Sequence, residues 1–208
     1  MTRLHPPSQL LKAKKHLSKD PILKGVISMY PIPEFPKSQT VFQELVKSIA
    51  YQQISYKAAD SIFARFLILM GNENFLPEDL VHFSEEEVRS VGFSRPKTKY
   101  IFNIAQYFID NEVDEEVWEA LSNDEIIELL TTIKGVGEWT VQMILMFQLL
   151  RPDVFPSKDL GIQNAMINLY KLKTEKRQLI NDMEKIAKKW KPYRSFASKY
   201  LWAWKREN

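Results

Sequence analysis

The sequence predicts an all-α protein, and three observations support this fold class. Apolar residues recur every three or four positions along most of the 208-residue chain, which is the period of one helix face. Alternating apolar and polar residues bounded by Asn-Gly or Asp-Gly, the pattern of a β-hairpin, are absent. Capping-box spacings, Ser84 with Glu87 and Ser122 with Glu125, mark helix starts. We expect about ten helices.

Apolar stripes at helical spacing identify three of these helices most clearly, while a proline-rich segment interrupts the pattern. Six of the eleven prolines fall within the first 36 residues, so we expect residues 30–36 to form an extended arm. The stripes, in chain order, are Phe42, Leu45, Val46 and Ile49; Ile101, Ile104, Ala105 and Phe108; and Leu179, Met183, Ile186 and Trp190.

Composition excludes several classes of protein. With 45% hydrophobic and 26% charged residues, the chain is neither globally disordered nor collagen-like. It has no apolar run of the ~18 residues that a membrane helix needs, and residues 1–20 lack a signal-peptide core, so we expect a cytoplasmic protein, or a nuclear one if the source is eukaryotic. The absence of cysteine excludes disulfides, thiol nucleophiles, cysteine-based zinc sites and iron–sulfur clusters.

Charge is distributed unevenly, although the net charge is only +3. Lys and Arg outnumber Asp and Glu by 10 to 4 in residues 1–72 and by 15 to 7 in residues 129–208. In residues 73–128 the acidic residues are in excess, 15 against 4. Two basic ends that fold together could form a polyanion-binding face, whereas the alternative is that amphipathic helices simply carry solvated charge.

Residues 123–151 read as a helix, a tight turn and a second, largely apolar helix. The turn, Lys134-Gly-Val-Gly-Glu138, contains two glycines two positions apart, which allow a sharp turn and close approach to a ligand. A turn before a helix N-terminus presents unpaired amides, and with Lys134 beside it the natural ligand is a phosphate. Most such turns, however, merely connect two helices.

A proline-punctuated loop, Arg151-Pro-Asp-Val-Phe-Pro-Ser-Lys-Asp159, follows the second helix and places one carboxylate where the next helix begins. From the residues alone, Asp159 is equally well interpreted as a catalytic group or as a helix N-cap.

These two segments resemble the helix-hairpin-helix DNA glycosylase superfamily, and within it the DNA-3-methyladenine glycosylase II branch. The resemblance runs from about residue 40 to the C-terminus. Four motifs occur in the order typical of the family: Tyr51-Gln-Gln-Ile-Ser55, Ile133-Lys-Gly-Val-Gly-Glu-Trp-Thr140, Asp153-Val-Phe-Pro-Ser-Lys-Asp-Leu-Gly161, and Trp190-Lys-Pro-Tyr-Arg-Ser-Phe-Ala197 with Trp202.

The resemblance implies specific roles for the hairpin and for the carboxylate. Backbone amides of Gly135, Val136 and Gly137 would bind a DNA phosphate, often with a monovalent cation, and no side-chain metal site or organic cofactor is expected. Lys134 replaces a proline common in the family; it could add a phosphate contact or have no functional role. Asp159 would stabilise the oxocarbenium-like sugar of N-glycosidic cleavage.

The resemblance also implies that the enzyme is monofunctional, because Trp139 stands where strand-nicking relatives carry a Schiff-base lysine. Trp139 and Trp202 would stack on the base, with Met143 and Leu160 as pocket walls. Helical phase independently places Trp202 off the apolar face of its helix, beside Ser198 and Lys199. Each of the four pocket candidates also has a simpler interpretation: a core residue, a surface residue or a contact between lobes.

Base flipping requires a side chain that fills the vacated space in the duplex. By the resemblance this wedge is Gln53, flanked by Gln52 and Ile54; the alternative is that Gln53 is simply an exposed turn residue.

The expected fold is bilobal, with residues 38–148, including the hairpin, in one lobe. Residues 1–37 and 149–208 form the other, and DNA lies in the cleft between them. An N-terminal β domain, which some members carry, does not fit before residue 38.

The expected function is hydrolytic release of alkylated purines, of the 3-methyladenine and 7-methylguanine class, from double-stranded DNA by a monomeric enzyme. A purine methylated at a ring nitrogen is cationic and leaves without prior protonation, so one carboxylate suffices. This agrees with the absence of histidine from the motifs. The alternatives are a glycosylase of the same fold for deaminated or mispaired bases, and a non-catalytic protein that binds damaged DNA.

Overall fold

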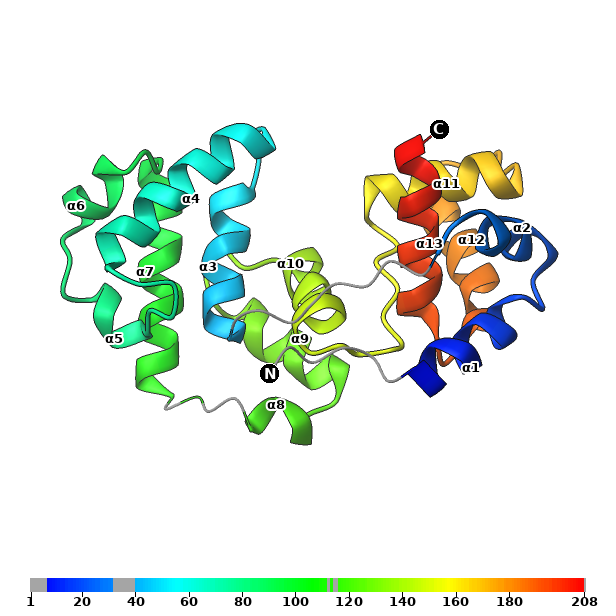
Figure 1. The fold of residues 1–208 in the computed structure, drawn as a ribbon, viewed down its shortest axis with the longest axis horizontal. Helices are drawn as coiled ribbons and strands as arrows, with labels where there is room; N and C mark the ends of the chain where they lie inside the picture. Colours follow the sequence, from blue (N-terminus) through cyan, green and yellow to red (C-terminus); the bar gives the residue numbers. More distant parts are fainter. Residues whose placement is uncertain (1–6, 32–39, 112, 114–115, 208) are drawn as a thin grey trace. The chain divides into compact units, whose positions relative to one another are not determined.

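The computed structural model describes residues 7–31, 40–111, 113 and 116–207, and this part of the chain is helical without strands (Figure 1). No described helix is long and apolar enough to cross a membrane. The α-helices are α1 (Pro7–Leu17), α2 (Pro21–Met29), α3 (Val41–Tyr51), α4 (Tyr56–Met70), α5 (Pro77–Leu80), α6 (Glu85–Ser90), α7 (Arg95–Asp110), α8 (Val117–Ala120), α9 (Asn123–Thr131), α10 (Glu138–Met143), α11 (Leu160–Tyr170), α12 (Lys176–Ala187) and α13 (Arg194–Glu207); a π-helical segment (Ile144–Gln148) and a 3₁₀ turn (Lys188–Trp190) complete the set.

The chain divides into two compact units. Residues 38–144 form the central unit, and residues 1–37 with 145–208 form the terminal unit. The sequence placed the boundary after residue 148, whereas the structure places it after Ile144. The reason is local, because the amide of Arg151 donates to the carbonyl of Leu145 (2.7 Å) and Phe147 packs against Trp202.

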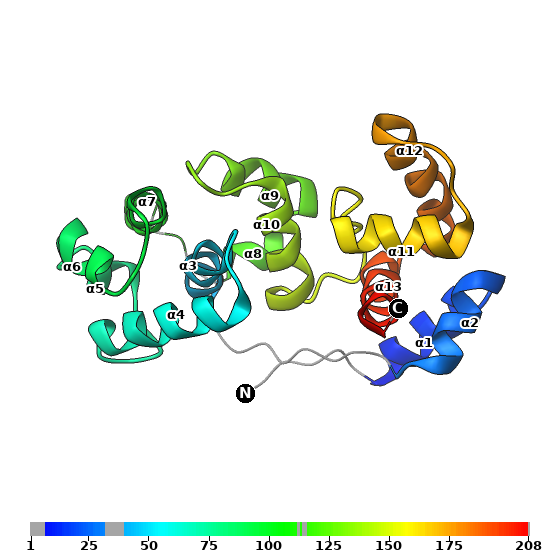
Figure 2. The same cartoon turned by 90° about the horizontal axis from the view of Figure 1, so that it is seen from above.

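In the central unit, α3 and α7 run side by side, with α4 against α3 and α5 and α6 against α7 (Figure 2). Aromatic side chains fill the space between these helices. The ring of Phe66 meets that of Phe75 edge-on at 5.3 Å, and Phe42 contacts both Phe75 and Phe108. Helices α9 and α10 pack against each other and form the two arms of the hairpin.

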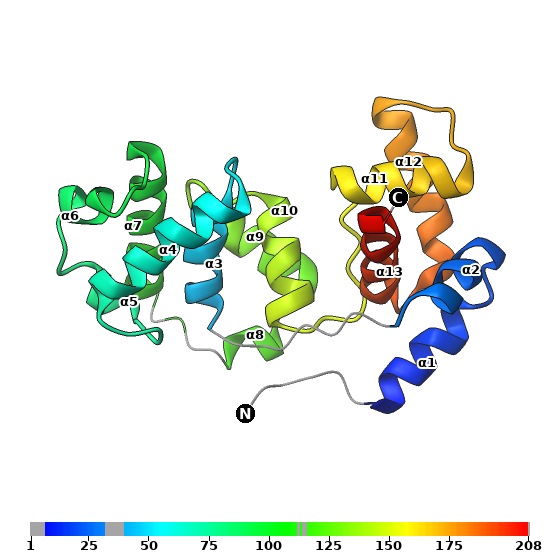
Figure 3. The same cartoon turned by 45° about the horizontal axis from the view of Figure 1, so that its top comes forward.

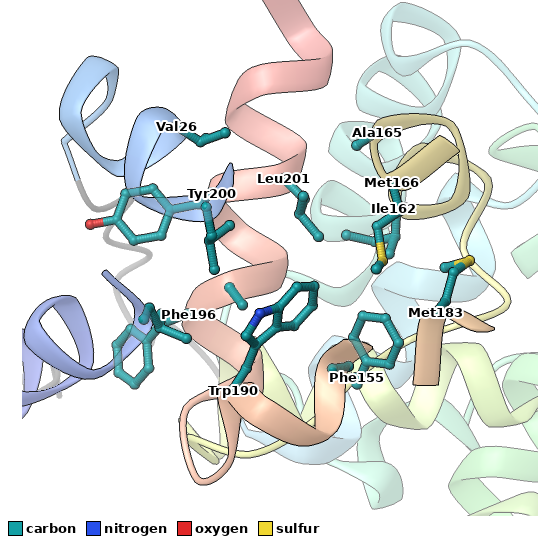
Figure 4. Packing of buried hydrophobic residues seen from close by; sticks show 14 of the residues in the cluster. Val26, Phe155, Ile162, Ala165, Met166, Met183, Trp190, Phe196, Tyr200 and Leu201 are labelled. Carbon is teal, nitrogen blue, oxygen red and sulfur yellow. The ribbon is translucent and has the colours of Figure 1, made fainter. Parts of the chain in front are cut away.

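In the terminal unit, α13 packs against both α11 and α2 (Figure 3). The core of the terminal unit contains Trp190, whose indole meets the Phe155 ring edge-on with ring centroids 5.7 Å apart. Ile162, Met166 and Met183 belong to the same cluster (Figure 4). Residues 195–201 of α13 are all buried, so this helix is covered on more than one face. Such burial is typical of a central helix rather than of a surface helix.

The structure confirms most of the expected local signals. All members of the first two apolar stripes are buried, as is the third stripe except Ile186, which is half-buried. Ser84 and Ser122 each form the expected capping box. The expected arm at residues 30–36 lies outside the described residues except for Tyr30, which ends α2 in an extended conformation, and Pro31.

Candidate active site and hairpin

The loop that carries Asp159 is attached to the start of α13 by two neighbouring side chains. The guanidinium of Arg194 donates from Nε to Oδ1 (2.7 Å) and from Nη2 to Oδ2 (2.9 Å) of Asp153, a bidentate pair of fixed geometry. The hydroxyl of Ser195 donates to the carbonyl of Arg151 (2.6 Å) and accepts from the amide of Val154 (2.9 Å). Ser195 is fully buried. These bonds hold the loop in one conformation.

Asp159 lies at the N-cap of α11, and two donors converge on its Oδ1. The amide of Ile162 donates at 2.9 Å and the indole Nε1 of Trp202 donates at 2.8 Å. Asp159 is therefore the N-cap of α11, as one of the two interpretations expected. The hydrogen bond from Trp202 is an additional contact that the sequence did not reveal. Because both donors reach the same oxygen, they fix the orientation of the carboxylate group.

Trp202 is half-buried and packs against Phe147, with ring centroids 5.7 Å apart. The sequence predicted that Trp202 lies off the apolar face of its helix beside Ser198 and Lys199. That prediction implied that this side of the helix lies outside the core. The implication is wrong, because Ser198 and Lys199 are both buried. The ammonium of Lys199 lies 5.6 Å from the Phe147 ring centroid, a cation–π arrangement that contributes to the burial of this face.

Gly161 makes the close approach of Trp202 to Asp159 sterically feasible. A Cβ at this position would lie 3.0 Å from Oδ1 of Asp159 and 3.1 Å from Cδ1 of Trp202, tighter than ordinary contact. The neighbouring pocket candidate, Leu160, is 73% exposed in the first turn of α11. Its interpretation as a core residue is therefore wrong.

The remaining pocket candidates and the wedge candidates meet within the central unit. Trp139 and Met143 of α10 line one pocket of about 490 Å³ together with the turn between α3 and α4. Trp139 is 44% exposed, so it is not a core anchor. Gln53 is exposed in the turn, and the other lining residues are Glu44, Lys47, Ser48, Tyr51, Gln52 and Ile54.

The hairpin between α9 and α10 is held against α7. Gly135 has a φ of +106°, a conformation that favours glycine, and a Cβ there would lie less than 3.0 Å from three atoms of Tyr100. The side-chain amide of Asn103 donates to the carbonyl of Lys134 (3.2 Å). Gly137, in contrast, is exposed, and a Cβ at its position would meet no atom within 4 Å.

One expected phosphate contact needs correction. The amide of Val136 donates to the carbonyl of Ile133 (3.0 Å) and closes the turn, and the Val136 side chain is buried. This amide is therefore not available to an anion. Within the described residues of the turn, no backbone carbonyl accepts from the amides of Gly135 or Gly137. Lys134 is exposed beside them.

The chemistry of the hairpin carbonyls is compatible with a monovalent cation. The carbonyls of Ile133 and Lys134 each accept one hydrogen bond, and a carbonyl oxygen has a second lone pair that can bind a cation. Among the described residues, no three His, Asp or Glu side chains come close enough together to hold a metal ion.

Sequence reasoning missed the residues that support the site. Arg194 and Ser195 stood within a recognised motif without a role, and Tyr100 was not singled out. A glycine pair predicts that another group approaches the backbone closely, but it does not identify that group. Here it is the ring of Tyr100, from a helix that ends more than 20 residues earlier in the chain.

Comparisons with known proteins identify a matching family and several similar relatives. Residues 46–192 match the model of the HhH-GPD superfamily of base excision DNA repair proteins. The chain is 37% identical over 204 residues to DNA-3-methyladenine glycosylase 1 of Schizosaccharomyces pombe, covering 94% of this chain and 87% of that protein.

Two solved structures are similar along nearly the whole chain. The Schizosaccharomyces pombe 3-methyladenine DNA glycosylase Mag1, solved with abasic DNA, matches with a TM-score of 0.79 and 36% identity over 92% of this chain and 95% of that one. A DNA-3-methyladenine glycosidase from Bacillus halodurans matches with a TM-score of 0.82 and 32% identity over 98% of this chain and 92% of that one.

Proposed function

Because the chain belongs to the HhH-GPD superfamily of base excision DNA repair proteins, we propose that it is a monofunctional DNA glycosylase that releases alkylated purines from duplex DNA. The observation that carries this proposal is the carboxylate of Asp159, held by Ile162 and Trp202 at a helix start. An oriented carboxylate is the group that hydrolysis of an N-glycosidic bond requires, and the relatives named above are 3-methyladenine glycosylases.

In the proposed reaction, the bond between the sugar C1′ and the base nitrogen breaks with its electron pair leaving on the base. A purine methylated at N3 or N7 already carries a positive charge, so it leaves as a neutral molecule. Asp159 stabilises the positive charge that develops on the sugar and orients water for attack at C1′, and the proton that this water loses passes to the carboxylate or to solvent. Trp139, at the position of the lyase lysine in bifunctional relatives, cannot form a Schiff base, so the DNA strand remains intact.

DNA is bound in this proposal through the hairpin amides of Gly135 and Gly137, with Lys134 beside them. The carbonyls of Ile133 and Lys134 would hold a monovalent cation, which would supply positive charge for the phosphate. Gln53 fills the space that the flipped base leaves, and Trp139 and Met143 contact the base. The enzyme acts as a monomer on chromosomal DNA, in the cytoplasm of a bacterium or the nucleus of a eukaryote.

The test is single-turnover release of 3-methyladenine or 7-methylguanine from a duplex by the wild type and by Asp159→Asn. Asparagine caps helices as well as aspartate does, so the variant folds, whereas the loss of charge lowers the rate by about 100-fold or more. The control is Asp124→Asn. Asp124 is exposed in the first turn of α9, so this substitution removes the same charge and leaves the rate unchanged.

Three other outcomes would redirect the proposal. Equal rates for wild type and Asp159→Asn would remove Asp159 from the chemistry. Binding of damaged duplex without release of any base, including hypoxanthine and mispaired adenine, would indicate a non-catalytic binding protein. Strand cleavage without added alkali would contradict the monofunctional mechanism.

A further inference from the structure

The turn between α3 and α4 adopts an unfavourable backbone conformation at its tip. Gln53 has a φ of +58°, in the left-handed region that non-glycine residues rarely adopt, and its side chain is exposed. Such a conformation persists only where the surrounding structure enforces it, and it is concentrated at functional sites. The contacts that hold this turn therefore bear on whatever Gln53 does.

One of these contacts comes from α7. The ammonium of Lys97 donates to the main-chain carbonyl of Ala50 at 2.8 Å, although the two residues are 47 positions apart. Ala50 lies in the last turn of α3, where carbonyls lack a partner within the helix and carry the negative end of the helix dipole. Lys97 is thus a cap supplied from another helix, and burial lowers the pKa of its ammonium.

A second contact supports the turn from the other side. The hydroxyl of Tyr51, the last residue of α3, donates to Oδ1 of Asp60 in α4 at 2.5 Å. Burial, with Asp60 adding to its effect, raises the pKa of Tyr51 to about 12, so the phenol stays protonated and donates at neutral pH. Ser55 caps α4 by accepting from the amide of Ala58. The hydrogen bonds fix both helix ends that flank residues 52–54.

We propose that Lys97 is a positioning residue that holds the α3–α4 turn ready for insertion of Gln53 into the duplex. The proposal rests on the proposed function and deepens it, because it assigns the alignment of the wedge to a residue that touches neither the base nor the wedge itself. Removal of the ammonium frees the end of α3, and the strained backbone at Gln53 relaxes. The consequence is slower unstacking of the target base, while Asp159 chemistry is unaffected.

The experiment compares Lys97→Met, which keeps the aliphatic stem, with Lys97→Arg and with Lys99→Met. Lys99 is an exposed lysine two positions along the same helix. Each protein is given two duplexes, one with the alkylated purine opposite thymine and one with it opposite an abasic spacer, where no pairing partner is lost. A 2-aminopurine beside the lesion reports unstacking by its fluorescence, independently of base release. Duplex binding and thermal unfolding are measured in parallel.

We expect Lys97→Met to lose about tenfold in base release from the paired duplex, as for a hydrogen bond to a charged group, and to stay within about twofold of wild type opposite the spacer. The increase in 2-aminopurine fluorescence is smaller for Lys97→Met than for wild type. Lys97→Arg recovers most of the lost base release, and Lys99→Met matches wild type. Equal losses on both duplexes, or no loss on the paired one, would overturn the proposal.

The fluorescence arm separates this proposal from the proposed function. A wild type that unstacks the lesion without releasing a base would contradict the glycosylase activity, and Lys97 would then be judged by the fluorescence of its variants alone. A wild type that produces no fluorescence rise on binding would contradict both the wedge and the role of Lys97.

Discussion

Asp159 illustrates how one side chain can serve the fold and the proposed chemistry together. An N-cap needs a side-chain oxygen near the second or third amide of the helix, and Oδ1 of Asp159 meets this need through Ile162. The same oxygen accepts from Trp202, so the indole adds orientation without replacing the cap. The two interpretations that the sequence left open, capping and catalysis, are therefore compatible in one geometry.

Substitution of Gly161 separates the stability of α11 from the geometry of Asp159. We expect Gly161→Ala to change the free energy of unfolding by less than about 1 kcal/mol, because the helix propensity of alanine and the crowding of its Cβ act in opposite directions. Its Cβ presses on Asp159 and Trp202, however, and lowers base release by about tenfold. Urea unfolding and single-turnover kinetics measure the two effects.

The matched control is Gly25→Ala in α2 of the same unit, where a Cβ meets nothing within 4 Å. This variant gains helix stability with no change in base release. A Gly161→Ala enzyme with wild-type kinetics would mean that the contact between Trp202 and Asp159 does not govern the rate.

At the scale of elements, different physical causes account for the two glycines of the hairpin. Gly135 is required by its backbone conformation and by the Tyr100 ring of α7, whereas Gly137 has a φ of −101° and open space around it. The fold therefore explains the first glycine by its backbone conformation and its neighbour, and the second as a favoured N-cap residue of α10. The open space at position 137 also allows close approach of a ligand to the backbone.

This difference predicts unequal losses of stability for two single substitutions that both weaken binding. Gly135→Ala lowers the free energy of unfolding by about 1–3 kcal/mol and weakens duplex binding, because the hairpin must move away from Tyr100. Gly137→Ala lowers the unfolding free energy by no more than about 1 kcal/mol, the cost of a weaker N-cap of α10, and still weakens binding. Denaturant titration and fluorescence anisotropy on a duplex test both. Unchanged affinity in Gly137→Ala would contradict a phosphate contact at this amide.

At the scale of the whole chain, Asp20 connects the N-terminal helices to residues about 150 positions later. Its Oδ1 caps α2, while Oδ2 accepts from the hydroxyl of Tyr170 (2.9 Å) and from the indole of Trp190 (3.1 Å). Burial, together with the charge of Asp20, raises the pKa of Tyr170, so its hydroxyl remains a donor. The terminal unit is thus closed by a cluster that joins both ends of the chain.

We expect Asp20→Asn to lower the free energy of unfolding by about 2–4 kcal/mol. Asparagine keeps the helix cap, but its amide group cannot accept from both donors, which leaves buried polar groups unsatisfied. Thermal and urea unfolding at pH 7 measure the loss, with the exposed neighbour in Lys19→Ala as the control. A change below about 0.5 kcal/mol would show that the cluster does not hold the unit together.

Local patterns predicted the helical elements well, because apolar stripes and capping boxes depend on residues three or four positions apart. Ser84 and Ser122 were correctly assigned as caps for this reason. The π-helical segment Ile144–Gln148 was missed, since a wide turn has no distinct apolar period. The amide of Val136 was misassigned because the sequence does not show which amides a turn uses internally.

By itself the sequence determined an all-helical protein with a two-glycine hairpin, a carboxylate at a helix start and a tryptophan off its apolar stripe. Only the tertiary structure decided that Trp202 donates to Asp159 across 43 positions and that Ser198 and Lys199 of the same helix are buried. It also brought Trp139 and Met143 to the same pocket as Gln53. Helical periodicity records which face is apolar, but the partner of each face depends on packing between distant segments, which no local pattern encodes.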